Sequence, residues 1–192
     1  MTIIEKLISD SNFKHSKNVA VISRIVALNA GFSESDVSII EQAALLHDVG
    51  KSTIPPRILN KPDALTPGEF EIVKTHADAG YSQIMEAVRI LTISASVAKE
   101  HHEKLDGSGY HKMQGNSINP YVRLISIVDV FDALLSKRVY KESWDVANVI
   151  QYLKSHDNYF DSVIVNCLVS VIDQILKIYK PVVTSNAAHE GI

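Results

Sequence analysis

Apolar residues recur at steps of three and four along most of the chain, which is the spacing of one face of an α-helix. For example, Val37, Ile40 and His47 follow this spacing and would share one inward face. The same pattern predicts helices over residues 2–9, 13–29, 36–48, 66–80, 81–87, 90–102, 121–135, 145–153 and 161–179. No convincing run of strands is predicted, so the expected fold class is all-α.

Residues with strong preferences for helix ends support several of these boundaries. Gly31 stands where the C-terminal cap of the second helix belongs, and Ser33 or Ser35 can cap the third. Thr66 and Glu69 form a capping-box pattern, with a proline at the first helical position between them. These signals place helix starts and ends independently of the apolar pattern.

Glycine and proline interrupt the helical pattern elsewhere. The helix that begins at residue 66 is expected to pause near Gly80. The proline-containing segment 51–63 is expected to be a loop held against the domain by apolar side chains. The segment 106–120 is a loop by composition, because it is rich in glycine, serine and asparagine.

Length and composition fit one globular domain. The chain has 192 residues, of which 46% are hydrophobic and 21% charged, and this is enough to form a substantial core. We expect a single domain over residues 1–180, in which 1–12 form an N-terminal helix region. Residues 181–192 are expected to be a polar, flexible tail.

Charge and cysteine content restrict the partners. The net charge of −3 provides no basic field, which argues against a nucleic-acid polymer as a partner. No apolar run approaches the roughly 18 residues of a membrane span, and the first residues lack a signal-peptide pattern. The single cysteine, Cys167, cannot form an internal disulfide, so the expected location is the cytoplasm. Nothing in the sequence indicates the oligomeric state.

Histidines and aspartates stand on the predicted inward faces of five separate helices. They are His15, His47, Asp48, His76, His101, His102 and Asp129. A single histidine on an apolar face is usually a core residue whose ring nitrogens are satisfied, whereas a lone buried carboxylate is costly. Five such costs in one stable domain are better explained by a bound cation, which would neutralise the carboxylates and accept the imidazole lone pairs.

The ligand types also restrict the metal. Imidazole and carboxylate without thiolate suit Fe, Mn or Zn rather than a cysteine-rich structural zinc site. The candidates are too many for one tetrahedral ion, and Asp48 could bridge two ions through its two oxygens. Two metals about 3.5–4 Å apart are a recurring arrangement for the hydrolysis of phosphoesters. The pattern therefore favours a dinuclear site.

Five motifs resemble the HD-GYP family, the cyclic di-GMP phosphodiesterase branch of the HD-domain metal-dependent phosphohydrolases. They are LLHDVGK (45–51), ILNKPDALTPGEF (58–70), HADAGY (76–81), HHEKLDGSGY (101–110) and DVFDALLSKRVYK (129–141). The His-Asp pair alone is weakly specific, but HHExxDGxGY at this spacing after it is strongly specific. The resemblance implies an HD-domain helical bundle with a dinuclear metal site in its core.

The resemblance also implies roles for individual positions. One metal would be held by His15, His47, Asp48 and Asp129, and a second by Asp48, His76, His101 and His102. Asp48, which bridges the metals, and Lys51, which polarises a phosphate oxygen, would be the catalytic residues. The substrate would be contacted by Lys51, Gly109, Tyr110, Arg138 and Lys141. From the residues alone, the three cations would pass for surface charges and Tyr110 for a loop anchor.

Three features depart from the family pattern. The GYP motif of the family reads Gly109-Tyr110-His111 here, so the proline that would stiffen this loop is missing. The three-metal subset of the family carries a glutamate where this chain has Ser11, so two metals are expected. A sensory or receiver domain before the motifs is not expected, so regulation is expected from a separate protein partner or from the substrate.

These assignments predict hydrolysis of a cyclic dinucleotide, with cyclic di-GMP as the first substrate, by a hydroxide that bridges two divalent metals. Fe or Mn is expected before Zn, Mg or Ni. One alternative keeps this chemistry but acts on another cyclic dinucleotide or on a nucleoside phosphate. A second alternative is a non-hydrolytic sensor or interaction module, which His111 favours and the full set of metal ligands disfavours.

Overall fold

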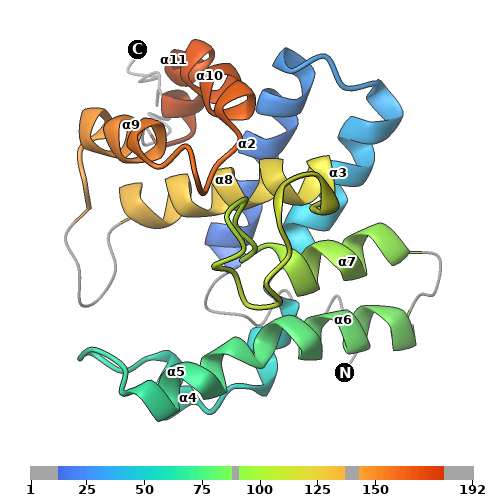
Figure 1. Ribbon diagram of the computed structural model, residues 1–192, viewed down its shortest axis with the longest axis vertical. Coiled ribbons are helices and arrows are strands. Elements are labelled where there is room, and N and C mark those ends of the chain that lie inside the picture. The colour runs from blue at the N-terminus through green and yellow to red at the C-terminus, as the bar shows by residue number, and fades with distance from the viewer. Residues whose placement is uncertain (1–12, 88–90, 137–142, 180–192) are drawn as a thin grey trace, which may run out of the picture.

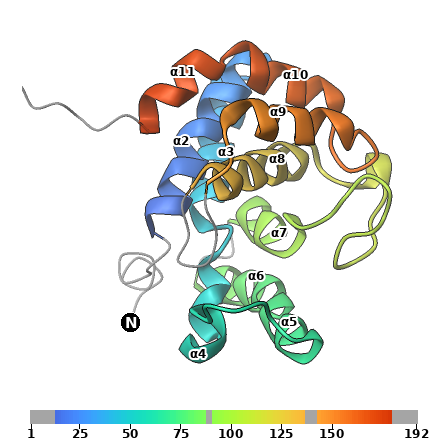
Figure 2. The same ribbon diagram turned by 90° about the vertical axis from the view of Figure 1, so that its left-hand side faces the viewer.

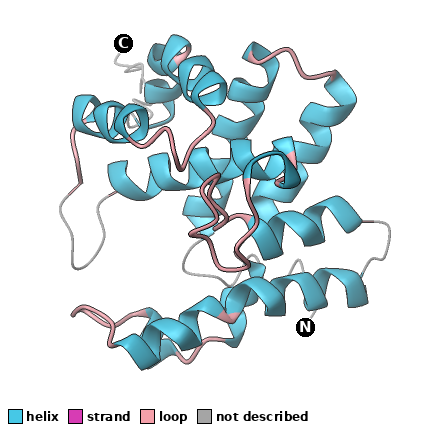
Figure 3. Ribbon diagram, viewed as in Figure 1, coloured by secondary structure: helices cyan, strands magenta, loops and turns pink. Residues whose placement is uncertain are grey.

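A computed structural model describes residues 13–87, 91–136 and 143–179 (Figure 1). All regular structure in these ranges is helical, and no residue within them forms a strand (Figure 3). The helices are α2 (Phe13–Asn29), α3 (Glu34–Leu46), η1 (Val49–Thr53), α4 (Pro56–Leu59), α5 (Pro67–Lys74), α6 (His76–Ala87), α7 (Thr92–Glu100), η2 (Gly115–Ser117), α8 (Pro120–Leu135), α9 (Val146–Ser155), α10 (Ser162–Ser170), α11 (Ile172–Leu176) and η3 (Lys177–Tyr179), where η marks a 3₁₀ helix. The all-α prediction is confirmed, while the predicted helix 2–9 and tail 181–192 lie outside the described residues.

Helix α8 is the centre of the main core. Figure 2 shows it surrounded by α2, α3, α9 and α10. Its apolar side chains cover most of its circumference, as expected for a fully enclosed helix, and four of them are completely buried: Leu124, Ile125, Val128 and Phe131. The same helix carries Asp129 and Asp132 into the interior. A carboxylate in such surroundings requires partners, because burying an unpaired charge is costly.

A smaller apolar cluster joins η1, α6 and α7, toward the bottom of Figure 2. Its buried members are Leu46, Val49, Ile84, Ala95 and Ala98. A Cβ atom on Gly50 would lie 2.0 Å from the carbonyl oxygen of His76, so only glycine allows η1 to pack directly on the backbone of α6. This close contact brings the end of α3 against the beginning of α6.

The predicted helix ends are largely observed. Gly31 has a positive φ of 83°, and the amide of Phe32 donates to the carbonyl of Ala27, which together form a Schellman cap after α2. Ser33, one of the two predicted caps, accepts a hydrogen bond from the amide of Asp36 at the start of α3. The capping box between Thr66 and Glu69 is also present.

The predicted pause near Gly80 is wrong. The break falls at Thr75, between α5 and α6, and α6 continues through Gly80. Gly80 instead allows close packing, because a Cβ atom there would lie 3.3 Å from the Cβ of Ala98 on α7. The glycine therefore serves a helix–helix contact, which periodicity along one segment cannot reveal.

Three further boundaries differ from the prediction. The predicted loop 51–63 contains the end of η1 and the short helix α4, with Pro56 at its first position. The predicted helix 90–102 ends at Glu100, so the two histidines that follow lie in a turn. The last helix is interrupted at Val171 and continues as α11.

The longest described helix, α2, has 17 residues, fewer than the roughly 20 that a membrane-spanning helix needs. No single helix among the described residues is long and apolar enough to cross a membrane. Only α10 taken together with the segment 172–179 meets the length and composition, and these two pieces are bent by 62°.

Candidate metal centre

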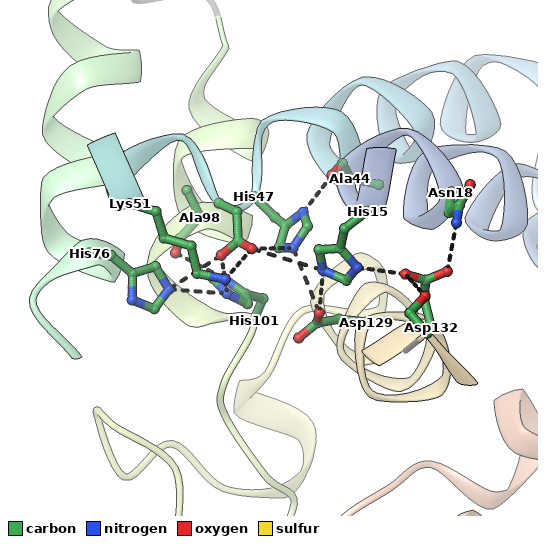
Figure 4. A network of polar contacts seen from close by, with 12 residues as sticks. His15, Asn18, Ala44, His47, Lys51, His76, Ala98, His101, Asp129 and Asp132 are labelled. Atoms are coloured by element: carbon green, nitrogen blue, oxygen red, sulfur yellow. Dashed lines mark hydrogen bonds and ion pairs between the residues drawn. The ribbon is translucent and has the colours of Figure 1, made fainter. Parts of the chain in front are cut away.

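All seven residues predicted as metal ligands come together in the interior. They arrive from the start of α2, the end of α3, the start of α6, the turn after α7 and the middle of α8 (Figure 4). Five of the seven are buried, and the other two, His15 and His102, are partly buried. The convergence of the side chains is therefore as the sequence predicts.

The ligand atoms of the described residues form three overlapping groups of three, and two of these groups share no residue, while the third, His47, Asp48 and His101, connects them. The first cluster consists of His15, His47 and Asp129, whose ligand atoms all lie within 4.8 Å of one another. The second cluster, with the same spacing, consists of His76, His101 and His102. A cation of suitable size could be held in either group.

Asp48 lies between the two clusters. Its Oδ2 is 3.3 Å from Nε2 of His47 and 3.9 Å from Nε2 of His15 in the first cluster. Its Oδ1 is 3.5 Å from Nε2 of His76 and 3.7 Å from Nε2 of His101 in the second. Each carboxylate oxygen therefore faces a different cluster, which is the arrangement of a bridging ligand.

Outer hydrogen bonds orient three of the histidines in the same way. In His47, His76 and His101, Nδ1 lies 2.6, 2.6 and 3.0 Å from the carbonyl oxygen three residues earlier in the chain. A carbonyl can only accept, so Nδ1 carries a proton and Nε2, the nitrogen left for a metal, faces the centre. Helix geometry thus fixes the tautomer that a metal ligand requires.

His15 is oriented by a carboxylate instead. Its Nδ1 lies 2.6 Å from Oδ2 of Asp132. The other carboxylate oxygen, Oδ1, accepts hydrogen bonds from Asn18 Nδ2 at 3.0 Å and from the hydroxyl of Tyr179 at 2.5 Å. Asp132 is completely buried. The sequence interpretation missed it, although its position three residues after Asp129 on the same inward helix face was a usable signal.

The donor set fits a divalent cation. Among the described residues, Nε2 of His47 and Oδ1 of Asp48 are buried without a hydrogen-bond partner. In addition, Nε2 of His76 and Nε2 of His101 are only 3.4 Å apart, with lone pairs directed at each other. Unsatisfied acceptors that converge in this way are costly without a cation. Nitrogen and oxygen donors without sulfur are typical of Fe, Mn and Zn sites.

The two clusters differ in their electrostatics. Burial lowers the pKa of His101 well below its ordinary value and lowers that of His102 to about 4, so these imidazoles are neutral. Burial also lowers the pKa of His47, but the nearby carboxylates of Asp48 and Asp129 outweigh it and raise this pKa to about 10. Without a metal, the first cluster therefore holds protons that a cation would displace.

Comparison with known proteins identifies the family. The family model described as HD domain matches residues 2–164. The chain belongs to the HD domain family. The resemblance inferred from the five motifs is thereby confirmed.

Curated relatives of the HD domain include bacterial phosphodiesterases. The chain is 42% identical over 134 residues to the cyclic di-GMP phosphodiesterase response regulator RpfG of Xanthomonas campestris, covering 69% of this chain and 35% of that protein. It is 35% identical over 167 residues to the 3'3'-cGAMP-specific phosphodiesterase 2 of Vibrio cholerae, covering 85% of this chain and 32% of that protein. The chain thus spans about a third of the length of these relatives.

A solved structure supports the fold. The chain resembles an HDG"Y"P protein from Bdellovibrio bacteriovorus with a TM-score of 0.70 and 19% sequence identity. The match covers 83% of this chain and 51% of that one. At this identity the likeness establishes the helical architecture of the HD domain.

Lys51 lies at the edge of the candidate metal centre. It follows the His-Asp pair in η1, and its ammonium group donates to Oδ2 of Asp48. The ammonium charge, after burial, is the largest influence on Asp48 and helps to hold the pKa of that carboxyl well below its usual range. Asp48 is therefore a carboxylate at neutral pH, with a cation already beside it.

The side chain of Glu103 anchors the loop that carries Gly109 and Tyr110. The buried Glu103 accepts hydrogen bonds from the amides of His111 and Met113, both at 2.7 Å. Gly109 packs so closely that a Cβ atom there would lie 2.5 Å from the Cα of Glu103. Glu103 thus fixes the backbone around His111, where the family has proline, and sequence reasoning had not identified this role.

Tyr110 lies beside the second cluster. The centroid of its ring is 4.6 Å from that of His102, and the two rings are inclined by 39°. Tyr110 therefore lies next to two candidate ligands, and Gly109 precedes it in the loop packed on Glu103. The other two predicted substrate contacts, Arg138 and Lys141, lie outside the described residues.

Proposed function

We propose that this HD domain hydrolyses a phosphodiester bond of a cyclic dinucleotide, and that cyclic di-GMP is its preferred substrate. The observation that carries the proposal is Asp48, whose two oxygens face two different clusters of candidate metal ligands. A pair of metal ions a few ångströms apart suits the hydrolysis of phosphate diesters. Relatives named as cyclic di-GMP phosphodiesterases support the choice of substrate.

We propose two divalent cations as cofactors, with Fe or Mn before Zn, Mg or Ni. The first would be held by His15, His47, Asp129 and Asp48, and the second by His76, His101, His102 and Asp48. When bound, the cations would supply an activated water and positive charge to the phosphate oxygens. Ser11, in place of the glutamate of the three-metal subset, supports a count of two.

The remaining residues would bind and orient the substrate. Lys51 would donate a hydrogen bond to a phosphate oxygen, because its ammonium already lies against Asp48. Arg138 and Lys141 would contact further phosphate oxygens, as the family resemblance implies. Tyr110, held against His102, and Gly109 would form the wall of the site on the side of the second cluster. These roles place positive charge and an aromatic ring around the reacting phosphate.

We further propose that residues 1–180 act as one catalytic domain in the cytoplasm, where a single unpaired cysteine is stable. A separate regulatory protein would then be the partner that controls the activity. Such control is compatible with the relatives, in which the matched region is only part of a longer protein.

The decisive experiment is metal analysis of anaerobically purified protein together with turnover of cyclic di-GMP. We expect about two Fe or Mn ions per chain and hydrolysis that a chelator abolishes. Chromatography of the products would show whether one or both phosphodiester bonds are cut. Absence of metal under every loading condition would contradict the proposed centre, and two metals with tight binding but no turnover would favour a sensor.

A second candidate substrate is 3'3'-cGAMP, because one relative is named as specific for it. Both substrates carry the same phosphodiester linkage type that the centre would cut, so the metal residues do not discriminate between them. Comparison of kcat/KM for cyclic di-GMP, 3'3'-cGAMP and a nucleoside phosphate would rank the candidates. Preference for cGAMP by more than tenfold would replace cyclic di-GMP in the proposal.

A further inference from the structure

Helix α5 carries aromatic and charged side chains without a core of its own. None of its residues, Pro67 to Lys74, is buried. Its position depends instead on the capping box at its start and on the ion pair between Lys61 and Glu69, at 2.6 Å. The hydrophobic effect alone does not explain a phenylalanine here, because Phe70 remains 46% exposed.

Phe70 lies against Tyr110, the aromatic residue beside the second cluster. Its ring centroid lies 6.3 Å from that of Tyr110, and the two rings are inclined by 86°. Tyr110 in turn contacts the second cluster, with centroids 4.6 Å from His102 and 6.4 Å from His76. An exposed ring on α5 thus extends the aromatic wall of the site away from the metal ligands.

Lys74 completes this arrangement one turn later on the same helix. Its Nζ lies 5.8 Å from the ring centroid of Phe70 and 5.4 Å from that of Tyr110. Both oxygens of Glu71 lie 3.1 Å from this Nζ and hold it in place. A lysine ammonium has three protons to donate, so it can bind a further acceptor.

We propose that Phe70, Lys74 and Tyr110 form a platform that receives one purine base of the substrate beside the second cluster. This inference rests on the proposed function and adds to it a specificity site on α5. A base has a flat π face that stacks on one ring and meets the edge of the other, as two rings at a right angle allow. Guanine presents two adjacent acceptors, N7 and O6, whereas adenine presents one acceptor and one donor. Lys74 therefore favours guanine.

Helix α5 provides its own control residue. Ile72 lies two residues after Phe70 and is similarly exposed, at 40%, but its side chain takes no part in the ring contacts described above. The variants to compare are Phe70→Ala, Phe70→Trp and Ile72→Ala. Each should be assayed with cyclic di-GMP and with methyl p-nitrophenyl phosphate, a small diester that has no purine base.

We expect Phe70→Ala to raise KM for cyclic di-GMP about tenfold with little change in kcat, because it removes a stacking contact. Turnover of the small diester should stay within about twofold, and Phe70→Trp should restore the low KM. Ile72→Ala should resemble the wild type with both substrates. Equal effects of Phe70→Ala and Ile72→Ala, or an equal loss with both substrates, would overturn the platform and leave the proposed function intact.

Lys74→Gln tests the preference for guanine separately. We expect it to reduce the ratio of KM for cyclic di-AMP to KM for cyclic di-GMP by about five- to tenfold. An unchanged ratio would contradict the assignment of Lys74. Wild-type protein that hydrolyses the small diester but no cyclic dinucleotide would overturn the proposed function and the platform together.

Discussion

The two histidine clusters sit on different parts of the fold and differ in charge. The first cluster is built on α2, α3 and α8, around the main core, and contains the carboxylate of Asp129. The second cluster consists of imidazoles alone and is supported by the smaller core of α6 and α7. The negative charge near the second cluster comes from Asp48 and, at His102, also from Asp129 of the first cluster.

This difference indicates a division of labour. A dication interacts more favourably with the first cluster, because carboxylates offset its charge and Asp132 strengthens His15 as a donor. The second cluster binds through neutral nitrogen donors and lies beside Tyr110 and α5, where we place the substrate. We therefore expect a tight ion in the first cluster and a weaker ion, close to the base platform, in the second.

The largest effect should come from the residue that both clusters share. Asp48→Asn removes the bridging charge while preserving the shape of the side chain. We expect about a 10³-fold loss of cyclic di-GMP turnover and at most one metal per chain by elemental analysis. Asp78→Asn is the matched control, because that carboxylate is exposed and lies two residues after His76. Full metal content and turnover in Asp48→Asn would contradict the shared role.

The next test separates the clusters. Asp129→Asn alters the first cluster and His102→Gln the second, and both changes preserve much of the side-chain volume. Calorimetric titration with Mn²⁺ should show a tight binding step, for the first cluster, and a weak step, for the second. Asp129→Asn should lower the affinity of the tight step, and His102→Gln that of the weak step, each by more than about 100-fold. Loss of the same step in both variants would show that the clusters are not independent sites.

A smaller effect is expected from the outer hydrogen bond to His15. Asp132→Asn keeps the shape but removes the charge that strengthens the imidazole, so the affinity of the tight step should fall about 10- to 100-fold. The weak step should not change. Asp36→Asn provides a matched control, since Asp36 also accepts from a tyrosine hydroxyl, that of Tyr121 at 2.6 Å. A change in the affinity of the weak step alone would show that Asp132 acts on the second cluster, contrary to this assignment.

The smallest predicted effect concerns the capping box that holds α5 beside the second cluster. The hydrogen bond from Lys61 and those from Thr66 lower the pKa of Glu69 to about 2, below its ordinary value of 4.5. The contribution of the charged group to stability is therefore present above pH 4.5 and is lost as the pH falls toward about 2. The difference in Tm between metal-free wild type and Glu69→Gln should shrink over this range. A difference independent of pH would exclude a role for the charge.

The convergence of the seven candidate ligands could be predicted because each of them belongs to a local helical pattern or directly follows one. His47 follows Val37 and Ile40 on one helix face, and His101 follows Val97 in the same way, so their inward direction could be predicted. The caps at Ser33 and Thr66 were also readable, since a capping residue acts on amides three positions away.

Features that depend on contacts between distant segments could not be predicted in this way. Gly80 suggested the end of a helix, whereas its role is to admit Ala98 of another helix. The role of Asp132 depends on its hydrogen bonds with His15 and Tyr179, which lie 117 and 47 residues away. The contact between Phe70 and Tyr110 likewise joins a helix and a loop that only the folded chain brings together. The pattern along one segment contains no record of such neighbours.

The most direct test of the shared carboxylate is anomalous X-ray diffraction from crystals of the protein loaded with Mn²⁺. We predict two anomalous peaks about 3.5–4 Å apart, one beside His15 and His47 and the other beside His76 and His101, with one oxygen of Asp48 directed at each. A single peak, or two peaks without Asp48 between them, would contradict the account.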